Sequence, residues 1–69
     1  MKDLTGEMVE FHAVRIVKGN PVRGVVISED KDSIQVKLEH TIEGLVTNWY
    51  EGEERWFDKK LINSIKIIT

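Results

Sequence analysis

Short runs of apolar residues alternate with polar turn residues along the whole chain, a pattern typical of short antiparallel strands. The clearest alternation lies in residues 34–39, where every second residue is apolar: Ile34, Val36 and Leu38. These side chains would share one face of a half-buried strand, because strand side chains alternate between two faces. The chain is therefore predicted to be all-β.

The first strand is predicted within residues 8–17, and its apolar residues change face partway along. Val9, Phe11 and Ala13 occupy one face, whereas Val14 and Ile16 continue on the other. Because alternation in a strand is strict, this change of phase predicts a bulge or a sharp bend near residues 12–14. Such a bend would let one long strand serve two sides of a small barrel.

Two turns bound the second strand, which is predicted in residues 22–28. The first turn, at residues 18–21, contains Gly19, which can adopt a positive φ, and Pro21, which favours an extended Asn20. The second turn, at residues 29–33, is rich in Asp and Ser, whose side chains can hydrogen-bond their own backbone. These turns indicate a long first hairpin followed by a shorter one.

The pattern weakens between residues 40 and 52. This segment fits either a pair of strands or a long excursion closed by Glu51 and Gly52. A further strand is predicted at residues 55–57, where Trp56 and Phe57 must point to opposite faces. Phe57 is the better core candidate, and Trp56 is expected to face outward or to line a barrel end.

The last segment fits two structures. Four apolar residues recur there at helical spacing: Leu61, Ile62, Ile65 and Ile68. Asp58 is a candidate N-cap for such a helix. However, a segment so rich in isoleucine forms a poor helix, and Ile65 and Ile67 alternate as in a strand. We therefore predict a single tight helical turn at residues 59–63, followed by a short final strand.

About five short strands, a long first hairpin and a tight turn before the last strand make the chain similar to the Src-homology-3-like (SH3-like) small β-barrels. The residues that carry the resemblance are Gly6, Val9, Phe11, Gly24, Val26, Asp32, Ser33, Ile34, Val36, Trp56, Phe57 and Leu61. Bacterial versions include KOW-type domains and small stand-alone proteins of Gram-positive bacteria and their phages. The resemblance implies one antiparallel barrel domain over residues 1–69, and such folds host many binding functions. The expected core is Val9, Phe11, Val26, Ile34, Val36, Leu38, Phe57 and Ile65.

The composition of the chain narrows the possible class of protein further. With 69 residues and no cysteine, the chain has room for one core that no disulfide can cross-link. A net charge of −2 argues against a strong, sequence-independent nucleic-acid binder, which would normally be basic. No apolar run is long enough for a signal peptide or a membrane span, so the cytoplasm is the expected location.

Catalytic and metal chemistry are not expected. His12 and His40 each follow a glutamate closely, but neither lies at a spacing typical of metal ligands. Ser28, Ser33 and Ser64 lie at predicted strand ends or turns, with no histidine nearby in sequence to activate a nucleophile. We therefore expect a protein without enzymatic activity, without a cofactor and without a bound metal.

The aromatic residues provide the strongest candidate contact surface. One small core cannot hold every ring, so some are expected at the surface, where aromatic residues commonly anchor partners. The candidate protein-binding residues are Trp49, Tyr50, Trp56, Glu53 and Glu54. Alternatively, these rings cap the core or bury a face between copies in a homo-oligomer.

Two function hypotheses remain. The first is a small non-catalytic protein-interaction or regulatory module of bacterial or phage origin, favoured because the residues beside the aromatic ones are mostly acidic. The second is a nucleic-acid-binding, KOW-like barrel, whose contacts would be Arg15, Lys18, Arg23 and Lys37.

Overall fold

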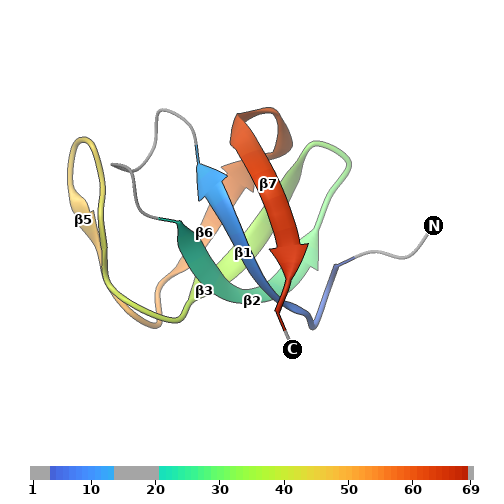
Figure 1. The fold of residues 1–69 in the computed structure, drawn as a ribbon, viewed down its shortest axis with the longest axis horizontal. Helices are drawn as coiled ribbons and strands as arrows, with labels where there is room; N and C mark the ends of the chain where they lie inside the picture. Colours follow the sequence, from blue (N-terminus) through green and yellow to red (C-terminus); the bar gives the residue numbers. More distant parts are fainter. Residues whose placement is uncertain (1–3, 14–20, 69) are drawn as a thin grey trace.

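The computed structural model describes residues 4–13 and 21–68, which form an all-β structure. A five-stranded antiparallel sheet has the order β6-β3-β2-β1-β7, and a separate two-stranded hairpin joins β4 to β5 (Figure 1). The sheet strands are β1 (Met8–Ala13), β2 (Val22–Glu29), β3 (Ser33–Leu38), β6 (Glu54–Asp58) and β7 (Ile62–Ile67). The hairpin strands are β4 (Ile42–Glu43) and β5 (Asn48–Trp49), and a 3-10 turn, η1, spans Lys59–Leu61.

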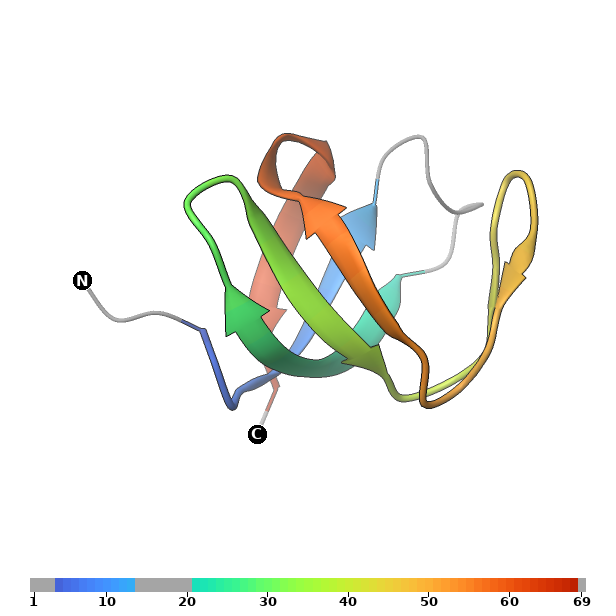
Figure 2. The same ribbon diagram turned by 180° about the vertical axis from the view of Figure 1, so that it is seen from behind.

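The five-stranded sheet is curled, so that its two halves face each other. β1 and β7 lie in front of β3 and β6 in Figure 1 and behind them in Figure 2, and the curved β2 joins the two halves. The register of β2 against β3 shifts between Val26 and Ser28, which is where an extra residue bends the strand. Within the described residues no ladder joins β6 to β7, so the sheet is open and has two edges.

The core lies between the two halves of the sheet and follows the alternation in the sequence. The buried apolar residues are Val9, Phe11, Ala13, Val22, Val26, Ile34, Val36, Leu38, Ile42 and Phe57. Seven of the eight expected core residues are therefore confirmed. The prediction for Ile65 is wrong, because its side chain is 40% exposed. Ile65 lies on β7, which is at the edge of the sheet. Among the described strands β7 pairs with β1 alone, so less of the sheet covers the Ile65 side chain.

The bulge predicted near residues 12–14 is not found in the described part of the first strand, because burial alternates without a break from Val9 to Ala13. The register between β1 and β7 shifts between Glu10 and His12, but the extra residue lies on β7, where Ser64 has φ of 57°. The polar turn after β2 forms, with the Asp30 backbone N–H donating to the Ser33 carbonyl at 2.7 Å. Val14, Ile16 and the turn at residues 18–20 lie outside the described residues.

The two ambiguous segments each adopt one of the predicted structures. Between residues 40 and 52 the chain forms a pair of short strands, in which Ile42 lies opposite Trp49. Near the C-terminal end, the Asp58 carboxylate accepts a hydrogen bond from the Lys60 backbone N–H at 2.8 Å and caps η1. β7 follows directly, which confirms the tight turn and the final strand.

Candidate functional site

Strand β6 places two aromatic side chains on opposite faces of the sheet. Phe57 is fully buried, and its ring meets that of Phe11 edge to face at a centroid distance of 5.1 Å. The neighbouring Trp56 points the other way and is 51% exposed. This division follows from the alternation of a strand that pairs with β3 along its length. The sequence interpretation of the two residues is confirmed.

Trp49 belongs to the end of the core. Its ring lies 5.4 Å from that of Phe57, centroid to centroid, and it packs against the buried cluster. The Arg55 guanidinium lies 5.0 Å from the centroid of the Trp49 ring and also contacts the Glu53 carboxylate at 3.0 Å. Trp49 thus contacts both a phenylalanine ring and an arginine, the latter through a cation–π interaction.

Tyr50 and Glu53 form a turn that leads from the hairpin into β6. The Glu53 carboxylate accepts a hydrogen bond from the Tyr50 backbone N–H at 2.6 Å, and the Glu53 N–H donates to the Tyr50 carbonyl at 3.1 Å. Gly52 has φ of 89°, a conformation that glycine adopts without strain. The Tyr50 side chain is 59% exposed. The turn therefore presents its tyrosine to solvent on a hydrogen-bonded backbone.

Acidic residues flank the exposed Trp56. Glu54 and Asp58 lie two positions before and after it on β6, so all three side chains are on the outward face. On the adjoining strand β3, Gln35 is the register partner of Trp56, and Lys37 is the partner of Glu54. We call Glu54, Trp56 and Asp58 the outer face of β6. On this face, a tryptophan side chain lies between two carboxylates.

The tip of the β4–β5 hairpin is apolar, which sequence analysis missed. Leu45 and Val46 are exposed, Val46 almost completely. The hairpin projects from the side of the sheet (Figures 1 and 2). No alternation or turn signal in residues 40–52 indicated which apolar residues would be left outside.

The two described basic residues of the nucleic-acid alternative, Arg23 and Lys37, both lie beside acidic residues. Arg23 lies on β2 between Glu10, whose carboxylate is 3.2 Å from the guanidinium, and Glu39, at 3.9 Å. Lys37 is exposed and faces Glu54 across the sheet. Arg15 and Lys18 lie outside the described residues. Arg23 therefore carries little uncompensated positive charge, and Lys37 has an acidic neighbour on the adjoining strand.

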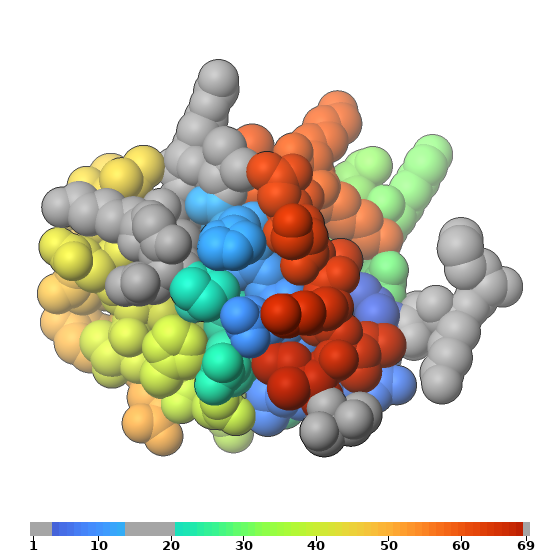
Figure 3. Space-filling model, viewed as in Figure 1, coloured from blue at the N-terminus to red at the C-terminus, as the bar shows by residue number. Residues whose placement is uncertain are grey.

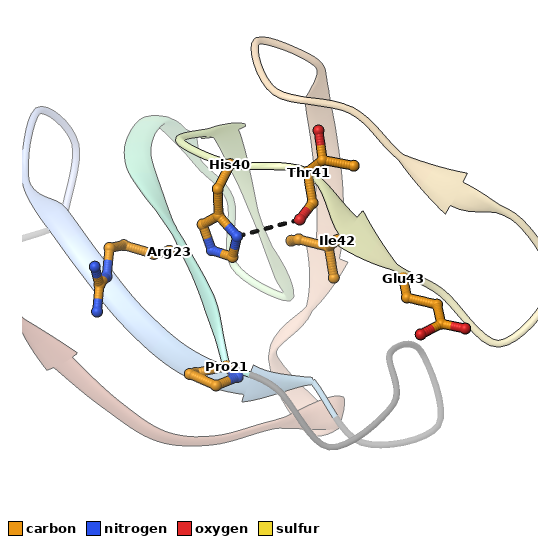
Figure 4. A pocket seen from close by; sticks show the side chains of 6 residues that line it. All are labelled: Pro21, Arg23, His40, Thr41, Ile42 and Glu43. Atoms are coloured by element: carbon orange, nitrogen blue, oxygen red, sulfur yellow. Dashed lines mark hydrogen bonds between the residues drawn. The ribbon is translucent and has the colours of Figure 1, made fainter.

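A surface hollow of about 320 Å³ opens beside the start of β4 (Figure 4). Its lining residues are Pro21, Arg23, His40, Thr41, Ile42 and Glu43. The His40 Nδ1 atom lies 3.3 Å from the Thr41 carbonyl oxygen, and the Arg23 guanidinium is already held by two glutamates. The hollow brings one imidazole, one carboxylate and one guanidinium to the same surface, beside the Thr41 hydroxyl.

The other chemical candidates do not converge. His12 is exposed on β1, and His40 lies at the hollow beside β4. Within residues 4–13 and 21–68, no three His, Cys, Asp or Glu side chains are grouped so that they could hold a metal ion. None of the helical segments in this part of the chain has the length and apolar character needed to cross a membrane.

Comparisons with protein-family models, with curated proteins and with solved structures find no match to this chain.

Proposed function

We propose that this chain is a small non-catalytic protein-binding module that contacts its partner through the outer face of β6 and the exposed Tyr50. The observation that carries the proposal is the orientation of Trp56. Its side chain is half exposed between two carboxylates, whereas the next residue, Phe57, fills the core. Exposed tryptophan and tyrosine are the residues that most often anchor protein interfaces.

The proposed fold is a small SH3-like barrel, of which the curled five-stranded sheet is the wall. The strand order, the bent β2 and the 3-10 turn between β6 and β7 support this assignment. A small barrel of this kind presents a rigid sheet face, so a partner would bind without a large ordering cost. We propose that the chain is of bacterial or phage origin and that this interaction takes place in the bacterial cytoplasm.

The charge around Trp56 favours a protein partner with basic residues. Glu54 and Asp58 would repel a phosphate backbone but would complement lysine or arginine at the rim of a protein interface. Arg23, a residue of the nucleic-acid alternative, is occupied by Glu10 and Glu39. Trp49 serves this surface indirectly, since it holds the hairpin against the core through Phe57 and Arg55.

The test compares partner capture by wild type and by Trp56→Ala from a lysate of the organism that encodes the chain. Captured proteins are quantified by mass spectrometry, and circular dichroism shows whether each variant is folded. Ile67→Ala is the matched control, because Ile67 is another large, half-exposed apolar residue on the other edge strand. We expect a specific protein to be lost with Trp56→Ala and retained with Ile67→Ala. Equal capture by folded wild type and Trp56→Ala would contradict the proposal.

A further inference from the structure

The β4–β5 hairpin gathers exposed apolar side chains in a short stretch of chain. Across residues 4–13 and 21–68, six large apolar or aromatic side chains are exposed, and three of them lie within residues 45–50: Leu45, Val46 and Tyr50. Leu45 is 52% and Val46 is 98% exposed. Isolated apolar side chains are common on protein surfaces, whereas neighbouring ones mark contact sites. Their concentration on this hairpin therefore indicates a contact site.

Leu45 and Val46 lie at the tip of the hairpin, beyond Glu43 and Asn48, the last register pair of its two strands. The hairpin projects from the side of the sheet in Figures 1 and 2, and in the space-filling view it forms an outer margin of the molecule, in yellow (Figure 3). Hairpin turns usually contain Gly, Asn or Asp, which suit the backbone of a tight turn. The turn itself therefore does not account for a leucine and a valine at its tip.

The base of the hairpin is anchored, which holds the tip out from the core. Ile42 is buried and is the register partner of Trp49, whose ring lies 5.4 Å from that of Phe57. The Thr41 hydroxyl accepts a hydrogen bond from the Glu51 backbone N–H at 3.3 Å and links the two ends of the hairpin. A tip on an anchored base loses less conformational entropy when it binds, which favours affinity.

The segment that carries the tip is acidic. Residues 40–54 contain no lysine or arginine and four glutamates: Glu43, Glu51, Glu53 and Glu54. An anionic membrane surface, a nucleic-acid backbone and the same segment of a second copy would all repel these charges. A protein surface with lysine or arginine would attract them. Among the possible occupants, the charge of the segment thus favours a protein with basic residues.

We propose that the hairpin tip inserts Leu45 and Val46 into an apolar pocket of a protein partner, whose rim carries lysine or arginine side chains. A projecting tip is complementary in shape to a concave surface, and Val46 would bury nearly its whole side chain there. The inference rests on the proposed protein-binding function and adds to it a contact that lies apart from the outer face of β6. The pocket would recognise the apolar tip, and the rim would recognise the glutamates beside it.

The first test identifies what lies against Val46 in the cell that encodes the chain. The full chain carries the photo-reactive amino acid p-benzoylphenylalanine in place of Val46 or, as the control, in place of the exposed Lys31 in the β2–β3 turn. Mass spectrometry identifies the cross-linked peptides. We expect position 46, but not position 31, to cross-link to one protein, at an apolar pocket with lysine or arginine around it. No protein cross-link from position 46, or equal cross-linking from both positions, would overturn the proposal.

The second test titrates that purified protein with variants of the chain. Val46→Ser is expected to weaken binding by about tenfold or more, because it removes a valine side chain from the pocket. Since Val46 is almost fully exposed in the free chain, the same change should leave the thermal midpoint where it is. Glu51→Lys should weaken binding more at low salt than at high salt. Lys31→Ser is the matched control and should bind as wild type does, whereas undiminished binding by Val46→Ser would overturn the proposal.

Two further measurements address the other occupants. Phosphatidylcholine vesicles with and without phosphatidylglycerol are sedimented with the chain, and sedimentation velocity reports self-association. Vesicle binding or dimerisation that Val46→Ser abolishes would identify a membrane or a second copy as the occupant and overturn the proposal. Trp56→Ala separates the tip from the outer face of β6. Loss of binding by Val46→Ser with normal binding by Trp56→Ala supports the tip and contradicts the β6 surface, and the reverse result overturns the tip contact alone.

Discussion

Replacement of Phe57 by alanine should remove most of the stability of this domain. The Phe57 ring is fully buried and has two aromatic neighbours, Phe11 at 5.1 Å and Trp49 at 5.4 Å between centroids. Emptying such a site costs about 3–5 kcal/mol, from the lost transfer free energy and the cavity left behind. A domain of 69 residues has a free energy of unfolding of roughly 3–10 kcal/mol in all.

The adjacent Trp56→Ala variant is the matched control. Trp56 is the larger residue, but half of its side chain is already in solvent. Because full burial of a large apolar side chain contributes about 1.5–3 kcal/mol, its loss should cost only about 1 kcal/mol. The two residues are adjacent in the sequence. The difference in stability between the two variants therefore reports which face of β6 each side chain takes.

Urea unfolding followed by far-ultraviolet circular dichroism measures both variants without relying on tryptophan fluorescence. We expect Phe57→Ala to be largely unfolded without denaturant or to unfold at a much lower urea concentration. Trp56→Ala should keep a cooperative transition close to that of wild type. Equal destabilisation by the two changes would refute the orientation of β6, and so would a loss of less than about 1 kcal/mol for Phe57→Ala.

Three further changes test other parts of the structure. Gly24→Ala should destabilise the fold by about 1–3 kcal/mol, because the added Cβ would meet the Lys37 backbone carbonyl and the Val36 side chain. Thermal unfolding measures the loss, and an unchanged midpoint would contradict this close approach of β2 to β3. The hydrogen bond from Lys59, together with that from the Leu4 N–H, holds the pKa of the Glu29 carboxyl below its ordinary value of 4.5. This pairing therefore stabilises the fold fully at a pH above 4.5, and the stabilisation is lost as the pH falls through the lowered pKa. Glu29→Gln should therefore be less stable than wild type at pH 7 and should converge with it in acid, and parallel unfolding curves at both pH values would argue against the pairing. Dialysis against a chelator should leave the thermal midpoint unchanged, since a structural metal would contribute directly to the folding free energy, and a fall of several degrees would reveal a metal site.

The sequence pattern predicted the parts of the fold that depend on local alternation. Val9 and Phe11 on β1, and Ile34, Val36 and Leu38 on β3, are buried as expected, because a period of two fixes which face each side chain takes. The same rule predicted that Phe57 faces the core and that Trp56 faces outward. Asp58 likewise indicated the turn before β7 through its capping side chain.

Features that depend on distant neighbours could not be predicted in this way. Ile65 has the spacing of a core residue, but its burial depends on whether another strand lies beyond β7. The contacts of Trp49 with Phe57 and Arg55 join β5 to β6, two strands whose relative position no local pattern determined. The exposed Leu45 and Val46 lie in a segment with neither alternation nor a clear turn signal. Periodicity reports the face of a side chain, whereas exposure also depends on what packs against that face.

The most direct test of the proposed function is the salt dependence of partner binding by two sets of variants. The captured partner is titrated with wild type, with Trp56→Ala, and with the charge-reversed pair Arg23→Glu and Lys37→Glu, at low and at high salt. A protein interface centred on Trp56 predicts that Trp56→Ala loses 2 kcal/mol or more of binding, roughly thirtyfold, at both salt concentrations, while the charge-reversed pair does not lose binding. The opposite result would be normal binding by Trp56→Ala, loss of binding by the charge-reversed pair, and wild-type binding that falls steeply with added salt. That result would contradict this account and indicate a nucleic-acid surface.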